Sequence, residues 1–160
     1  MKAATSINLV TVAAPGADLE AVRRLFVEYA ESLGISLCFQ GFDQELAALP
    51  GDYAPPQGCL LLAKEGAEVT GCVGVRPIDE VTCEMKRLYV RPQFRGTGLG
   101  RRLAETVIAG ARGMGYRRMC LDTLPSMQAA RGLYFSLGFT ACAPYYDNTC
   151  AGSDCFDLKL

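Results

Sequence analysis

A glycine-rich turn is the part of this 160-residue sequence whose residue types point most directly to chemistry. Gly96, Gly98 and Gly100 stand at alternate positions, between an apolar run that ends at Val90 and a helical pattern that starts at Leu99. Glycines in this arrangement leave several backbone N–H groups bare at the N-terminus of a helix. Such a turn binds an anion, and we expect that anion to be a pyrophosphate.

Two other phosphate-binding motifs do not fit this turn. A dinucleotide-binding fingerprint needs a third glycine three residues after the second, but the count from Gly96 or Gly98 ends on Arg101 or Leu103. A Walker-type loop needs Gly-Lys-Ser/Thr five residues after its first glycine, where this chain has arginine, leucine and alanine. A turn without any ligand remains the alternative, although glycine costs about 1 kcal/mol per helical position relative to alanine.

The chain contains no histidine, and this absence removes whole classes of catalytic site. Ser-His-Asp and Cys-His catalysis both need an imidazole, and mixed Cys/His zinc sites need one as a ligand. Any general base must therefore be a carboxylate, a tyrosinate, a water molecule or a chain terminus.

The eight cysteines favour neither a disulfide framework nor a metal site, because no Cys-x-x-Cys pair exists. Four of them lie in apolar segments that are typical of strands, where a free cysteine behaves as a small apolar residue: Cys59, Cys72, Cys83 and Cys120. We expect no metal. A reactive thiol stays an alternative for the other four: Cys38, Cys142, Cys150 and Cys155.

Length and charge predict one domain over residues 1–160, without a linker. Sixteen basic and seventeen acidic side chains leave the net charge near zero, which favours neither nucleic acid nor an anionic membrane as a partner. No apolar run is long enough to suggest a signal peptide or a membrane span, so we expect a cytoplasmic protein.

Hydrophobic periodicity predicts the elements that must position the glycine turn. Before the turn we expect a first strand, a helix capped by Asp18, a short helix, and three strands of an antiparallel meander, over residues 7–13, 19–33, 43–49, 59–64, 69–76 and 82–90. After it we expect a helix from Leu99 to Gly113, a strand over 118–121, a helix capped by Ser126 that ends at Gly138, and a last strand through Phe156. Strand, turn, helix and strand make one right-handed parallel crossover, so the sheet is mixed.

Two blocks of sequence resemble the GNAT acetyltransferase superfamily, over nearly the whole chain. Gln93-x-x-Gly96-x-Gly98, overlapping Arg95-x-x-Gly98-x-Gly100, follows Leu88–Pro92 as the coenzyme A loop does in that superfamily. The segment from Leu121 to Phe139, with its Leu-Gly-Phe ending, is similar to the superfamily's next strand and helix. The resemblance implies an α/β (mixed α+β) fold with a mostly antiparallel sheet of about six or seven strands, about four helices and one βαβ crossover.

The resemblance implies acetyl-CoA as cosubstrate. The amides of 95–101 would bind the pyrophosphate, helped by Arg95 and Arg101, although a solvated basic face is an equal alternative for Arg101. The N–H of Val90, at the end of a strand that splays from its neighbour, would polarise the thioester carbonyl. Where the family often has asparagine, contacts to pantetheine would come from Thr123 or Ser126. The full set of expected cofactor residues is Leu88, Tyr89, Val90, Arg95, Gly96, Thr97, Gly98, Leu99, Gly100, Arg101, Thr123, Ser126, Ala130 and Tyr134.

Tyr134 and Glu84 are the expected catalytic residues, by the same resemblance. The Tyr134 phenol would protonate the departing thiolate, and packing in the core is its alternative. Glu84 would serve as the base through one water, and an ion pair with Lys86 or Arg87 is its alternative. Alternation along the strand predicts that Glu84 shares a face with Lys86, Leu88 and Val90.

The acceptor pocket is expected in two polar-aromatic loops and beside the base, at Phe39, Phe42, Glu84, Tyr145 and Tyr146. The leading hypothesis is an N-acetyltransferase that moves an acetyl group to a primary amine of a small or amino-acid-like molecule by direct attack in a ternary complex. A protein or peptide acceptor is one alternative, and a coenzyme A binding or sensing domain without turnover is another. The sequence allows a homodimer.

Overall fold

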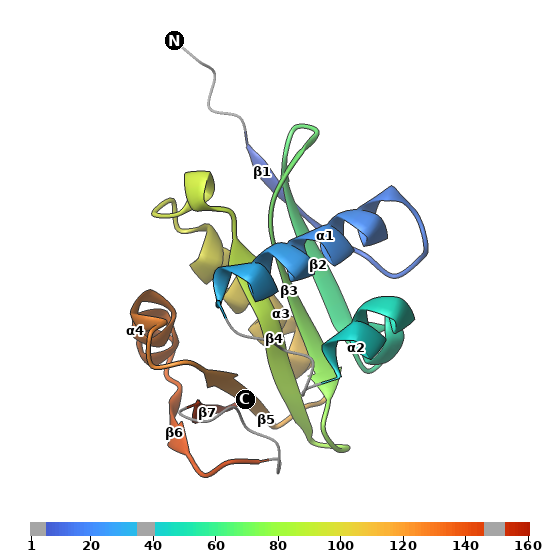
Figure 1. The fold of residues 1–160 in the computed structure, drawn as a ribbon. Coiled ribbons are helices and arrows are strands. Elements are labelled where there is room, and N and C mark those ends of the chain that lie inside the picture. The colour runs from blue at the N-terminus through green and yellow to red at the C-terminus, as the bar shows by residue number, and fades with distance from the viewer. Residues whose placement is uncertain (1–5, 35–40, 146–152) are drawn as a thin grey trace.

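A seven-stranded mixed sheet with helices on both faces makes up the structure, a computed structural model that describes residues 6–34, 41–145 and 153–160 (Figure 1). The strand order is β1-β2-β3-β4-β5-β7-β6. The strands are β1 (Ile7–Thr11), β2 (Cys59–Glu65), β3 (Glu68–Pro77), β4 (Thr82–Val90), β5 (Arg118–Thr123), β6 (Thr140–Cys142) and β7 (Asp154–Lys159). The helices are α1 (Ala17–Ser32), α2 (Phe42–Ala48), α3 (Leu99–Gly113) and α4 (Gln128–Ser136), with 3₁₀ turns η2 (Gly51–Tyr53) and η3 (Pro92–Phe94).

The predicted antiparallel meander and parallel crossover are both present. β1 to β4 pair antiparallel in chain order, and short turns join β2 to β3 and β3 to β4. At the second turn the Asp79 carboxylate accepts hydrogen bonds from the N–H groups of Val81 and Thr82, at 2.9 and 2.8 Å. β4 then leads through η3 and α3 to β5, which pairs parallel to it. This crossover places the glycine turn at the end of β4.

β4 and β5 separate soon after they meet. Their pairing runs only from Thr82 opposite Arg118 to Glu84 opposite Cys120, whereas β4 continues to Val90 and β5 to Thr123. The two strands therefore splay apart toward the glycine turn, as the family resemblance implied. Backbone groups on that edge of β4 are available for a ligand because no β5 residue pairs with them.

A bulge at Arg87 overturns the prediction that Glu84 shares a face with Leu88 and Val90. Arg87 has φ 59°, a left-handed conformation that is uncommon for a residue other than glycine, and the β3–β4 register shifts at this point. The extra residue reverses the alternation. Leu88 and Val90 pack toward α3, and Glu84 lies on the α1 side, where its cross-strand neighbour is Arg76.

Two apolar cores lie on the two faces of the sheet. In Figure 1, α1 crosses the front of the sheet and α3 lies behind it. Leu103 and Val107 of α3 pack with Val73 and Met119 on the α3 side, and α4 contributes Tyr134. On the other side a second cluster joins α1 and α2 to the sheet, with Val22, Leu25, Phe26, Leu60 and Leu62 fully buried. Each such aliphatic or aromatic side chain contributes about 1.5–3 kcal/mol relative to exposure.

Some local details differ from the sequence-based expectations. The residue that precedes α1 is Gly16, so Asp18 does not cap this helix as expected. Asp18 lies in the first turn of α1 and forms an ion pair with Lys64. The residue before α4 is Met127, not Ser126. β6 was not foreseen because three residues carry too little periodicity to show a strand. None of the helices in the described ranges is long and apolar enough to cross a membrane.

Candidate active site

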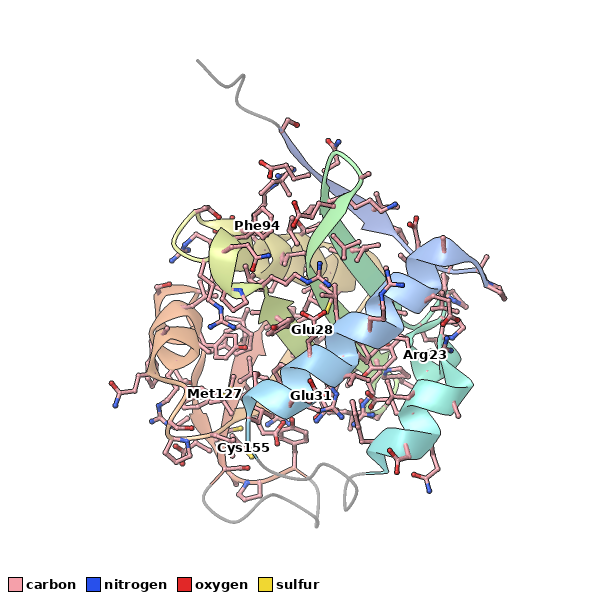
Figure 2. The ribbon with its side chains drawn as sticks, turned by 45° about the horizontal axis from the view of Figure 1, so that its top comes forward. Arg23, Glu28, Glu31, Phe94, Met127 and Cys155 are labelled. Carbon is pink, nitrogen blue, oxygen red and sulfur yellow. The ribbon has the colours of Figure 1, made fainter. Side chains whose placement is uncertain are left out.

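A groove of about 750 Å³ opens where β4 ends, between the glycine turn, the start of α4 and the end of α1. Phe94 lines the groove from the 3₁₀ turn before the glycines, and Met127 lines it from the segment before α4. Figure 2 shows Phe94 above Met127. Tyr29 and Leu33 line it from α1. Eleven of the residues expected to contact the cofactor line this groove: Leu88, Tyr89, Val90, Arg95, Gly96, Gly98, Leu99, Gly100, Arg101, Ser126 and Ala130.

The glycine turn takes a conformation that requires glycine. Gly96 and Gly98 have φ of 78° and 83°, a region that L-residues enter at a cost of about 1–2 kcal/mol. A Cβ at either position would meet nothing within 4 Å. The backbone conformation, and not lack of space, is therefore what selects glycine at these two positions.

The amides of this turn are free to bind an anion. Gly98 precedes α3, and its carbonyl accepts the first helical bond from Arg102 N–H at 3.1 Å. Among the described residues, the N–H groups of 96–101 have no protein acceptor. They add to the positive end of the α3 dipole. These features fit a diphosphate.

The two arginines expected to assist the diphosphate have protein partners. Arg95 donates from Nε to the Val90 carbonyl at 2.9 Å, and its guanidinium lies over the Tyr89 ring at 5.7 Å. Arg101 donates to Ser136 and pairs with Glu105 at 3.3 Å. Both arginines lie at the groove, so these surface interactions are weak ones that a phosphate can replace.

The backbone at the end of β4 directs Val90 toward the splay. The N–H of Arg91 donates to the Thr70 carbonyl on β3 at 2.9 Å. Because successive peptide groups of a strand point to opposite sides, the Val90 N–H points away from β3. It therefore points to the side on which β4 and β5 separate.

Three expected cofactor residues do not line the groove. The Thr97 hydroxyl donates to the Phe94 carbonyl at 2.7 Å, and the buried Thr123 hydroxyl contacts the Met127 sulfur at 3.6 Å. Tyr134 is buried in the apolar core on the α3 side of the sheet. Thr123 thus positions Met127, which does line the groove.

Tyr134 is buried with its ring edge against Phe139, at 5.8 Å between centroids. Burial raises the pKa of its phenol well above the usual value, and the nearby Tyr29 and Asp122 raise it further. The phenol therefore keeps its proton at any physiological pH. This environment fits the core interpretation, and the transfer of a proton from Tyr134 to the departing sulfur stays a prediction.

Glu84 is a buried carboxylate with donors on both oxygens. It is 3% exposed. Arg76 Nε donates to Oε1 at 2.8 Å, and the Tyr145 hydroxyl donates to Oε2 at 2.5 Å. Lys86 Nζ lies 3.7 Å from Oε2. The ion-pair alternative is thus realised with Arg76 and Lys86, and not with Arg87.

Glu84 belongs to a buried ionic network on the α1 side of β3, β4 and β5. Lys86 lies 3.4 Å from Asp122 on β5, and Arg87 is paired with Glu45 of α2. Arg76 bridges Glu84 and Glu45. Burial acts to lower the pKa of Arg87, but Glu45 and two nearby tyrosines raise it by more. Three carboxylates and three cations balance one another, which is the condition for burying charge.

Sequence reasoning missed Glu45 and Arg76 in this network. Glu45 lies 31 residues from Arg76 and 42 residues from Arg87 in the chain, so no short motif joins these residues. One signal was available: the run Glu84, Lys86 and Arg87 interrupts an otherwise apolar strand in the middle of the sheet. Charged residues in a central strand need buried partners.

The expected acceptor residues have different surroundings. Phe42 is 7% exposed and lies under the Arg87 guanidinium at 5.1 Å, so it packs in the core on the α1 side. Tyr145 contacts Glu84. Phe39 and Tyr146 lie outside the described residues.

The described cysteines are all free: Cys59, Cys72, Cys83, Cys120, Cys142 and Cys155. Burial raises the pKa of each of these thiols. Within residues 6–34, 41–145 and 153–160, no group of three or more Cys, Asp or Glu side chains could hold a metal ion.

Known proteins share this fold and this sequence pattern. The family model described as "Acetyltransferase (GNAT) family" matches residues 19–139. An uncharacterized N-acetyltransferase of Schizosaccharomyces pombe is 42% identical over 146 residues, which cover 90% of this chain and 89% of the relative. An acetyltransferase from Streptococcus agalactiae superposes with a TM-score of 0.80 at 21% identity, covering 96% of this chain and 98% of that chain.

A fourth comparison concerns the ligand. A GNAT family acetyltransferase from Elizabethkingia anophelis, solved with acetyl-CoA bound, has a TM-score of 0.70 at 23% identity, covering 96% of this chain and 98% of that chain. This chain belongs to the GNAT acetyltransferase family, and it is an acyltransferase enzyme.

Proposed function

We propose that this enzyme transfers an acetyl group from acetyl-CoA to the primary amine of a small or amino-acid-like acceptor, by direct attack in a ternary complex. The observation that carries the proposal is the alignment of three features along β4: free amides at the glycine turn, the splayed edge from Val90 to Leu88, and the carboxylate of Glu84 where the splay closes. Glu84 is 3% exposed, and an enclosed carboxylate favours a small acceptor over a protein chain.

The residues of the groove would hold the donor and aim its carbonyl. The turn amides bind the diphosphate, and the pantetheine arm lies along the splayed edge of β4. Acetyl-CoA supplies an activated acetyl thioester. The N–H of Val90 donates to the carbonyl oxygen and stabilises the negative charge that develops there.

Two side chains would move protons. An ammonium group of the acceptor must lose a proton before its nitrogen can attack, and Glu84 takes that proton. The Tyr134 phenol gives a proton to the departing sulfur, and the proton that the new amide sheds restores it by way of solvent. No covalent acetyl-enzyme is needed, which agrees with direct attack.

A thiol-release assay with acetyl-CoA against a panel of amines, amino acids and peptides tests the proposal. Turnover confined to small amines is the expected result, and preferential turnover of peptides would move the acceptor class to proteins. Acetyl-CoA should also raise the melting temperature, by a stabilisation of about 2.7 kcal/mol at hundredfold excess over its Kd, whereas NAD and ATP should do far less. A melting shift without any turnover would favour a binding or sensing domain.

A further inference from the structure

We propose that the acceptor's proton reaches Glu84 through the hydroxyl of Tyr145. This inference rests on the proposed function and adds a catalytic residue to it. It follows from how the oxygens of Glu84 are occupied and from where Glu84 lies along β4.

Both oxygens of Glu84 already accept a hydrogen bond. Arg76 Nε occupies Oε1 at 2.8 Å and the Tyr145 hydroxyl occupies Oε2 at 2.5 Å, while Lys86 Nζ at 3.7 Å from Oε2 is beyond hydrogen-bond distance. A guanidinium has donors only and does not give up a proton in proteins. A phenolic hydroxyl donates and accepts at the same time. Of these partners, Tyr145 can therefore pass a proton to the carboxylate while receiving another.

The distance along β4 also calls for an intermediary. The groove extends to Leu88, and Glu84 stands four residues earlier, at the last position where β4 pairs with β5. Four strand residues span about 13 Å, which is more than a glutamate side chain covers. Tyr145 comes from the segment after β6 and places its hydroxyl on Oε2 of Glu84, so that in our proposal it bridges the remaining distance to the acceptor.

Tyr145 is held in place at its backbone as well as at its hydroxyl. Its N–H bonds the sulfur of Cys155 on β7. Tyr145 is thus held against Glu84 by bonds at both its backbone and its hydroxyl, as a proton relay requires.

The proton balance of the step is simple. One N–H bond of the acceptor ammonium breaks and its proton joins the Tyr145 oxygen, as the Tyr145 O–H bond breaks and its proton joins Oε2 of Glu84. Tyr145 ends neutral, Glu84 becomes a carboxylic acid, and the amine keeps the electron pair with which it attacks. Glu84 then returns its proton to solvent, again through Tyr145.

Tyr145→Phe tests the relay because it removes the hydroxyl and keeps the ring. With an acceptor that is an ammonium ion at the assay pH, we expect kcat/KM to fall about 10²-fold. With a weakly basic acceptor such as an alkoxyamine, which is already neutral, we expect variant and wild type to differ by less than about threefold. Tyr116→Phe is the matched control, because the Tyr116 hydroxyl bonds the Gln57 carbonyl at 2.7 Å, away from the groove.

Glu84→Gln and the double variant supply a second measurement. If Tyr145 acts through Glu84, the double variant should be no slower than the slower single variant. The relay would be overturned if Tyr145→Phe lowered kcat/KM equally with both kinds of acceptor. It would also be overturned if the losses of the two single variants multiplied in the double variant. The acetyl-CoA melting shift must persist in every variant, which also shows that each one folds. Turnover by the wild type with no effect of Tyr145→Phe would refute the relay alone, whereas no turnover by the wild type would refute the proposed function.

Discussion

Arg87 and Glu45, 42 residues apart in the chain, form two hydrogen bonds, from Nε at 3.0 Å and from Nη2 at 3.3 Å. The pair fastens α2 to the bulge in β4. The Arg87 guanidinium also lies over the rings of Phe42 and Tyr29, at 5.1 and 5.9 Å. A residue in an uncommon backbone conformation is thus held by partners from two helices, which is how strain near a functional site is maintained.

Removing the charge of Glu45 should destabilise the fold. We expect Glu45→Gln to lower the free energy of unfolding by about 3 kcal/mol, because it leaves the Arg87 cation buried without a counter-charge. Glu28→Gln is a matched control: Arg91 also makes two bonds to Glu28, at 3.1 and 2.7 Å, but that pair is partly exposed. Its loss should cost less than about 1 kcal/mol. Urea unfolding checks both, and equal losses would contradict the role given to burial.

Alanine at the glycine turn should affect stability and cofactor binding together. Gly98→Ala places a Cβ at φ 83°, so we expect a loss of about 1–2 kcal/mol in stability and a weaker Kd for acetyl-CoA as the amides shift. Gly132→Ala in α4 is the contrast, since its Cβ meets nothing within 4 Å and its φ is ordinary. That variant should gain about 0.5–1 kcal/mol. Calorimetric titration and thermal melts measure both quantities.

Tyr134→Phe separates catalysis from packing. If the phenol protonates the leaving sulfur, kcat should fall about 10²-fold while the Kd for acetyl-CoA changes by less than about twofold. Because burial raises the pKa of this phenol, ionisation of Tyr134 should not limit the rate below pH 10. Tyr116→Phe again serves as control. An unchanged kcat would assign Tyr134 to the core alone.

Alkaline pH should weaken the fold through its buried thiols. Burial raises the pKa of Cys83 and of Cys120 from 9.0 to about 12. Between these values the unfolded chain loses the thiol protons and the folded protein keeps them, so stability is complete below pH 9 and falls as pH rises. Each thiol contributes up to about 1.4 kcal/mol per pH unit. Urea unfolding from pH 7.5 to 10 measures how steeply the free energy of unfolding falls with pH. The double variant Cys83→Ala, Cys120→Ala should make this fall less steep. An unaltered slope in the double variant would exclude these two thiols as its cause.

Local sequence predicted most elements of the fold and did not predict how the charges at its centre pair. Periodicity predicted the meander, the crossover and the helix that starts at Leu99, because each of these elements is long and strongly patterned. The bulge at Arg87 was not predictable, since its left-handed conformation depends on Glu45 and the rings above it. The caps at Asp18 and Ser126 were wrong for a smaller reason: helix starts shift by one or two residues with little energetic cost.

The candidate site divides in the same way. The groove residues between Leu88 and Arg101 are close in sequence, so the glycine turn was visible as a motif, whereas Tyr29 and Leu33 of α1 come from far away in the chain and were not foreseen. The roles of Glu84 and Tyr145 depend on contacts across 61 residues of chain, which no spacing reveals. The resemblance placed Glu84 as a base, and the arrangement of Arg76 and Tyr145 around it came only with the three-dimensional fold.

The short pairing between β4 and β5 has a mechanical consequence. Three paired positions join β1–β4 to the β5-β7-β6 unit within the sheet, so the molecule consists of two half-sheets with few shared backbone bonds. A ligand in the groove would contact both β4 and the segment at the start of α4, and would therefore hold the two half-sheets together. Amide hydrogen exchange in β5 and β7 should slow when the groove is filled, so that an occupied enzyme is a stiffer object than an empty one.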